Sequence, residues 1–219
     1  MKKYFKRGKL GVLAFLFFVV LSSNAQVFRG LAICGFNATQ VDGDEVFGYK
    51  KYGWNVGAGV QIPFKDKWFI SLENIYNRKG AYQPPRFTDS LSGEYRLILN
   101  YVEVPLLIQF EDKKTMTFGL GVSWGKLIEV KEYEHGNRVA ATTLSGPYAR
   151  SDWNFLGDVR FALYKRLKFN FRYAYSLGKI RTRTFNNKQE IWTRKQFNNL
   201  LTFRLIYVIN EKISRKKKE

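Results

Sequence analysis

In three segments of the chain, 52–64, 115–126 and 167–177, large apolar residues alternate with residues that are polar or small. In the first segment every second residue is apolar: Trp54, Val56, Ala58, Val60 and Ile62. The positions between them hold glycines and amides: Gly53, Asn55, Gly57, Gly59 and Gln61. A period of two is that of a β-strand, because successive side chains point to opposite faces. The pattern therefore predicts strands whose two faces meet different surroundings.

Weaker alternation occupies most of the remaining chain. In 68–79 the scheme is recognisable, although Phe69, Asn74 and Ile75 break it. We predict five further strands in this way, over 27–39, 68–79, 98–110, 153–163 and 196–209. Together with the three strict segments they make eight strands and an all-β protein.

The predicted connections alternate between short and long. The short ones are the turns 65–67, 111–114 and 165–166, and the long polar ones are the loops 41–51, 81–96, 128–151 and 181–195. Outer-membrane barrels have short turns at the periplasmic end and longer loops at the outer end. We therefore expect an eight-stranded antiparallel up-and-down transmembrane β-barrel over 26–210, with short periplasmic turns and long outer loops.

Alternation alone does not say which face is inside. A soluble, lipocalin-like barrel would turn its apolar face inward around a ligand. Strand length favours a membrane barrel, because the strands reach eleven or more residues and about 9–11 tilted residues cross a bilayer. The other face combines glycine with charge, which suits the narrow interior of an eight-stranded barrel. Aromatic residues also lie near strand ends, where girdles are expected: Trp54, Trp68, Trp124, Trp153, Tyr175 and Tyr207.

The first 25 residues have the three parts of a secretory signal peptide. Five basic residues precede Leu10, the run 10–21 is uncharged and almost wholly apolar, and Ser23 and Ala25 are small residues at the positions that signal peptidase reads. Twelve such residues are too few to span a bilayer, which takes about 20. We expect residues 1–25 to be cleaved and the mature protein to reach the outer membrane.

The composition excludes several kinds of site. The chain has one cysteine, Cys34, and one histidine, His135, so an internal disulfide and a zinc site of the usual ligands are both excluded. The run 121–125 (GVSWG) has the Gly-x-Ser-x-Gly spacing, but it lies within the predicted strand 115–126 and not at the strand-to-helix turn that a nucleophilic serine needs. No single loop gathers a nucleophile, a base and an orienting acid. We therefore expect no cofactor, no metal and no enzyme activity.

The predicted inward face carries charged residues that must be accommodated inside the wall. Two interpretations are open, an ion path and a salt-bridged plug, and the narrow interior of eight strands favours the plug. Within it we expect Glu73 and Glu103 to contact Arg172 or Arg204. The full set of predicted interior charges is Glu73, Glu103, Asp158, Arg160, Arg172 and Arg204.

Basic residues outnumber acidic ones by 37 to 18, which gives a formal net charge of +19. In a cytoplasmic protein this excess would suggest nucleic acid, but an exported barrel meets outer-membrane lipid and the anionic phosphates of lipopolysaccharide. We expect no nucleic-acid partner, and we interpret the basic segment 211–219 as a solvated periplasmic tail. The candidate contacts with an anionic partner lie in the last long loop: Arg181, Arg183, Lys188, Arg194 and Lys195.

Three stretches resemble the PorT-like small outer-membrane β-barrels of Bacteroidota. They are 73–80 (ENIYNRKG), 100–107 (NYVEVPLL) and 172–177 (RYAYSL). The resemblance implies a barrel of the outer membrane, and the founding member of that family is an accessory of the type IX secretion system. The chain departs from common barrels at its end, where the basic tail stands in place of a terminal aromatic residue.

These observations favour a structural or accessory role in the cell envelope, as a monomer or as a subunit of a larger complex. Three alternatives stay open: an accessory of the type IX secretion system, a small-solute channel and a lipid-modifying enzyme. Other envelope or secretion proteins are then candidate partners.

Overall fold

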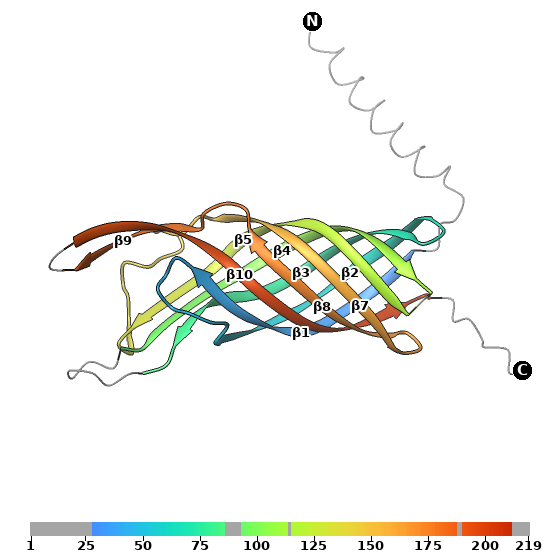
Figure 1. The fold of residues 1–219 in the computed structure, drawn as a ribbon, viewed down its shortest axis with the longest axis horizontal. Coiled ribbons are helices and arrows are strands. Elements are labelled where there is room, and N and C mark those ends of the chain that lie inside the picture. Colours follow the sequence, from blue (N-terminus) through green and yellow to red (C-terminus); the bar gives the residue numbers. More distant parts are fainter. Residues whose placement is uncertain (1–27, 86–92, 114, 188–189, 212–219) are drawn as a thin grey trace, which may run out of the picture.

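The chain forms a long, closed β-barrel (Figure 1). The expected signal peptide, 1–25, lies outside the described residues, and so does the expected tail apart from Glu211. Among the residues that are described, no helix is both long and apolar enough to cross a membrane. The ranges that the computed structural model describes are 28–85, 93–113, 115–187 and 190–211.

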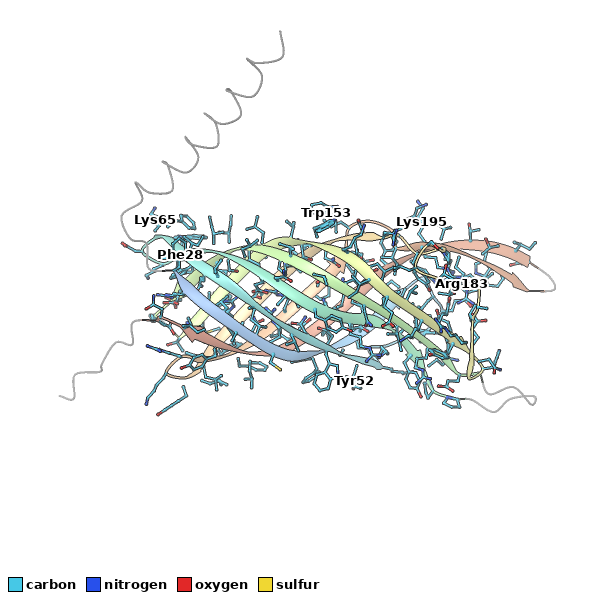
Figure 2. All side chains as sticks on the ribbon, turned by 180° about the vertical axis from the view of Figure 1, so that it is seen from behind. Phe28, Tyr52, Lys65, Trp153, Arg183 and Lys195 are labelled. Carbon is cyan, nitrogen blue, oxygen red and sulfur yellow. The ribbon has the colours of Figure 1, made fainter. Side chains whose placement is uncertain are left out.

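Eight long antiparallel strands form the barrel wall within these ranges. They are β1 (Arg29–Asp42), β2 (Lys51–Lys65), β3 (Trp68–Gln83), β4 (Tyr95–Asp112), β5 (Met116–Glu134), β7 (Ser151–Tyr164), β8 (Leu167–Ser176) and β10 (Glu190–Ile209). Each wall strand pairs with the next along the chain, and β1 pairs with β10 to close the sheet. The short turns, the start of β1 and the end of β10 all lie at one end of the barrel, where Figure 2 shows Phe28 and Lys65. The predicted fold class is confirmed.

The last long loop differs from the prediction. The segment 181–195 was expected to be a loop, but β9 (Arg181–Asn187) pairs with the first part of β10 and forms a hairpin that projects from the outer end (Figure 1). The rings of Phe185 and Trp192 stack on this hairpin, with centroids 5.8 Å apart. We call it the outer hairpin.

Two other loops are also shorter than predicted. The wall strands β3, β4 and β5 extend into 81–96 and 128–151, and the short strand β6 (Asn137–Arg138) pairs with the end of β5. In and beside these extensions several of the buried residues are apolar, among them Leu97, Leu99, Leu127 and Val130. These apolar side chains therefore face inward, whereas in the membrane they face outward, and a register shift at Asn100 and Tyr101 also interrupts the alternation. The pattern of the membrane segment consequently does not continue into these parts of the strands.

The two faces of the wall separate as the alternation predicts. The residues that break the pattern in β3 follow the same geometry, because Phe69 and Ile75 point inward and are buried while Asn74 is exposed on the outer face. The interior is therefore partly apolar. Near the short-turn end, one buried apolar layer consists of Leu31, Ile33, Ile75, Ile206 and Val208.

A continuous row of outward side chains crosses all eight strands of the wall. The row begins at Trp68 of β3 and, followed from strand to strand around the barrel, ends at Trp54 of β2. The register of β2 and β3 sets Trp54 beside Arg78, which is ten residues after Trp68 on β3. This offset is the stagger that closes the tilted strands into a barrel. We call the set the aromatic row, although one member is a valine: Trp68, Phe110, Phe118, Val159, Phe171, Phe203, Phe36 and Trp54.

Candidate functional site

Five charged side chains from four strands meet inside the barrel, and we call them the five-charge cluster. Glu73 of β3 is shared by three arginines. Its Oε1 lies 3.0 Å from Arg160 Nη2 and 3.0 Å from Arg172 Nη2. Its Oε2 lies 2.9 Å from Arg204 Nη1. Asp158 of β7 completes the cluster, and each of the five residues is at most 4% exposed.

Asp158 ties the same arginines to the opposite wall. Its Oδ2 lies 2.8 Å from Arg172 Nη2 and 3.4 Å from Arg204 Nη2, and its Oδ1 lies 3.2 Å from Arg160 Nε. Asn170 bridges the set, because its amide donates to Asp158 at 2.9 Å and its oxygen accepts from Arg204 Nε at 2.7 Å. Such charge-assisted bonds are the strong ones inside a protein.

A second group, nearer the outer end, is built around Lys79 of β3. Its Nζ lies 2.6 Å from Glu103 Oε1 and 2.9 Å from Asp152 Oδ2. The same amine donates to Asn154 Oδ1 at 3.1 Å, and Ser176 donates to Asp152 at 2.8 Å. We call Lys79, Glu103 and Asp152 the three-charge cluster.

The position of Glu103 corrects one expectation. Glu73 contacts Arg172 and Arg204, but Glu103 pairs with Lys79 and contacts neither arginine. The reason is the register of β3 and β4, which sets Glu103 opposite Ile75 and thus nearer the outer end than Glu73.

Sequence reasoning missed two members of the three-charge cluster. Lys79 lies on the predicted polar face but was not included among the interior charges, and Asp152 precedes the predicted strand 153–163. A signal was present, because Asp152 is in phase with Asn154 and Asp158. Extending the alternation by one step would have placed Asp152 inside.

The charges of the two clusters cancel. Together they hold four cations (Arg160, Arg172, Arg204 and Lys79) and four carboxylates (Glu73, Asp158, Glu103 and Asp152). The five-charge cluster has one cation in excess and the three-charge cluster has one carboxylate in excess. A buried charge is tolerated when it is paired and hydrogen-bonded. This part of the interior is therefore neutral and cross-linked from wall to wall.

The outer hairpin is fastened to the barrel through Glu132, near the outer end of β5. Arg181 Nη1 lies 2.9 Å from Glu132 Oε1, and Tyr95 donates to the same oxygen at 2.8 Å. Burial alone would raise the pKa of Glu132, but hydrogen bonds from Thr142 and Tyr95 and the Arg181 charge hold that pKa below its usual value. Burial and the nearby Glu132 carboxylate raise the pKa of Tyr148 to about 12.

The five basic residues expected to meet an anionic partner separate into different environments. Arg181 and Arg183 are half-buried and ion-paired with Glu132 and Glu134. Lys188 lies outside the described residues. Arg194 and Lys195 are exposed, and Figure 2 shows Lys195 pointing away from the wall. Arg194 and Lys195 are therefore the accessible candidates.

The short-turn end carries a ring of opposite charges. Lys168 Nζ lies 2.8 Å from Glu211 Oε1 and 3.6 Å from Glu111 Oε2. Arg29 lies 3.5 Å from Glu111 and 3.7 Å from Glu211. The first residue of the expected tail is therefore held against the barrel.

His135 has a structural setting in the outer loops. Its Nδ1 accepts a hydrogen bond from the backbone N–H of Gly93 at 3.2 Å. Across the part of the chain that the structure describes, no group of three or more His, Cys, Asp or Glu residues could hold a metal ion.

Comparison with known proteins finds a family match. A model of the outer membrane protein beta-barrel domain matches residues 25–181. Among solved structures, Ail of Yersinia pestis has 13% identity and a TM-score of 0.49, with 84% of this chain and 99% of Ail covered. Neisserial surface protein A has 11% identity and a TM-score of 0.48, with coverages of 84% and 99%. OprG of Pseudomonas aeruginosa has 14% identity and a TM-score of 0.43, with coverages of 85% and 98%. No curated protein matches the chain.

Proposed function

Because the chain belongs to the outer membrane protein beta-barrel domain family, we propose that it is a closed, non-enzymatic barrel with a structural or accessory role in the cell envelope. The observation that carries this proposal is the neutral pair of ionic clusters, which links β3 and β4 to β7, β8 and β10 across the interior.

An open ion path would require these clusters to separate. Glu73 alone accepts hydrogen bonds from three buried arginines, and leaving a charge buried without its partner costs about 3–5 kcal/mol. The closed arrangement argues against the small-solute channel. The two clusters act instead as internal struts that hold opposite walls at a fixed distance.

The outer hairpin is the surface best placed to contact a partner. It projects beyond the wall (Figure 1), and Ile191, Arg194 and Lys195 are exposed on it. Basic residues beside an apolar one suit lipopolysaccharide, whose phosphates lie close to the outer surface of such a barrel. In this proposal the wall and its struts hold the hairpin at the cell surface.

A deletion strain tests this role through complementation. We expect the barrier to a large antibiotic to be restored by the wild-type gene but not by a variant whose hairpin, 182–195, is replaced with a short turn. A surface variant, Glu129→Gln, serves as the control and should restore the barrier, because the Glu129 side chain is 43% exposed and lies outside both clusters. Full rescue by the shortened variant would contradict a role for the hairpin.

A second candidate, an accessory of the type IX secretion system, is supported by the three PorT-like stretches. The same stretches supply Glu73, Lys79, Glu103 and Arg172 to the two clusters. Much of the resemblance therefore reflects the construction of the barrel interior. The secreted-protein profile of the deletion strain decides this candidate: loss of many secreted proteins supports it, and an unchanged profile refutes it.

A further inference from the structure

The lipid-facing wall carries an apolar hollow of about 720 Å³, which we call the lateral groove. Its lining comes from neighbouring strands and includes Trp68, Phe110, Phe118, Leu120, Gly157 and Phe171. This volume falls within the range of about 300–1,000 Å³ that is usual for ligand sites.

The groove exists because bulk is missing at two outward positions of β7. The aromatic row has its only non-aromatic member there, Val159, between Phe118 of β5 and Phe171 of β8. The next outward position is Gly157, and a Cβ atom added to it would meet no atom within 4 Å. The small residues Gly157 and Val159 thus form the bottom of the groove, and the large side chains of the neighbouring strands form its sides.

The groove runs from one rim of the barrel to the middle of the wall. Trp68 begins β3 and Phe110 lies near the end of β4, both at the short-turn rim, whereas Gly157 is at the centre of β7 (Ser151–Tyr164). In outer-membrane barrels this rim faces the periplasm. The groove therefore covers the depth of the periplasmic leaflet.

The rim above the groove is basic. Lys67 Nζ lies 5.8 Å from the centre of the Phe110 ring, and Lys113 and Lys165 are exposed in the next two short turns. These turns belong to the strands that form the groove. Lysines therefore lie at this level in three turns, and phosphate groups are the negative charges of a phospholipid surface.

We propose that the lateral groove binds one phospholipid of the periplasmic leaflet, with an acyl chain against Gly157 and the phosphate near Lys67 and Lys113. Bulk lipid covers any barrel wall, but a preformed hollow fixes one chain at lower entropic cost. The inference depends on the placement of the barrel in the membrane and not on its accessory role.

Native mass spectrometry of the purified barrel in detergent tests the groove. Dipalmitoyl phosphatidylglycerol is titrated into the wild type, Gly157→Phe and Ala32→Phe. Ala32 is the matched control because it is also small and exposed on the outer face, but on β1. We expect Gly157→Phe to weaken binding about tenfold, the effect of about two methylenes that are no longer buried, and Ala32→Phe to leave it unchanged. The fold of each variant is checked by heat-modifiable gel mobility.

The phosphate contact is tested with dipalmitoylglycerol, which lacks the phosphate. The wild type should prefer the phospholipid, and a Lys67→Gln, Lys113→Gln double variant should lose that preference. Equal lipid binding by Gly157→Phe and Ala32→Phe would overturn the proposal. A dimer mass or a co-purifying protein that Gly157→Phe abolishes would also overturn it, since the hollow would then belong to a protein contact.

Discussion

The eight buried charges of the two clusters are arranged so that each has at least one opposite partner. Arg172 shows the pattern most clearly, because its guanidinium contacts both Glu73 and Asp158. Arginine suits this position, since its planar fork presents several donors in fixed directions. This pairing lets a barrel interior of low polarity hold the eight charges of the two clusters.

Glu73→Gln should destabilise the barrel strongly, because three arginines would lose their shared carboxylate. We expect the free energy of unfolding in urea from lipid vesicles to fall by about 3–5 kcal/mol. The control is Glu129→Gln, which removes a pair with Lys131 whose side chains are 43% and 36% exposed and should cost about 0–1 kcal/mol. Similar values for the two variants would show that the five-charge cluster contributes little.

The buried carboxyl group of Asp44 should make the stability of the loop between β1 and β2 depend on pH. Its carboxylate accepts the N–H of Val46 at 2.8 Å, and burial raises its pKa from 3.8 to about 7. The folded loop thus keeps a proton that the unfolded loop would release. Stability of the docked loop is greatest below about pH 4 and is lost progressively as the pH rises to about 7.

Limited proteolysis of this loop between pH 5 and pH 8 measures the effect. The cleavage rate of the wild type relative to Asp44→Asn should rise with pH, and the ratio cancels the pH dependence of the protease itself. A ratio that stays constant across this range would show that Asp44 does not titrate there.

At the scale of elements, the sequence predicts the strands well inside the membrane and less well outside it. The segment 52–64 is close to β2 (Lys51–Lys65) because a bilayer on one side and a packed interior on the other impose the alternation. The outer hairpin projects beyond the wall and does not lie between a bilayer and a packed interior, so its sequence does not show this alternation. Its position depends on Arg181 and Glu132, which are 49 residues apart, and no local pattern in the sequence reveals that contact.

Arg181→Gln should loosen the outer hairpin while leaving the barrel intact. The loss of hydrogen bonds to a charged partner costs about 1.5–3 kcal/mol, so amide exchange in β9 should accelerate about tenfold or more. Arg194→Gln is the control, because Arg194 is 52% exposed and lies 3.9 Å from Glu45. Unchanged exchange in Arg181→Gln would mean that backbone pairing alone holds the hairpin.

At the scale of the whole molecule, the closed barrel and its charged interior follow from the alternation, but the pairing of the charges does not. Alternation assigns Glu73 and Glu103 to the same face without giving their heights. The register of β3 and β4 separates them into two clusters, because it sets Glu103 opposite Ile75, where the side chain of Lys79 reaches it. The lateral groove has the same origin, since it requires the registers of β5, β7 and β8 together.

If the two clusters close the barrel, the purified, heat-modifiable protein should not conduct ions, and single-channel recording in a planar lipid bilayer measures this directly. We expect no resolvable conductance steps from the wild type at moderate voltage and salt, with a known porin as the positive control. Large, steady steps that disappear when the same sample is boiled before insertion would contradict it.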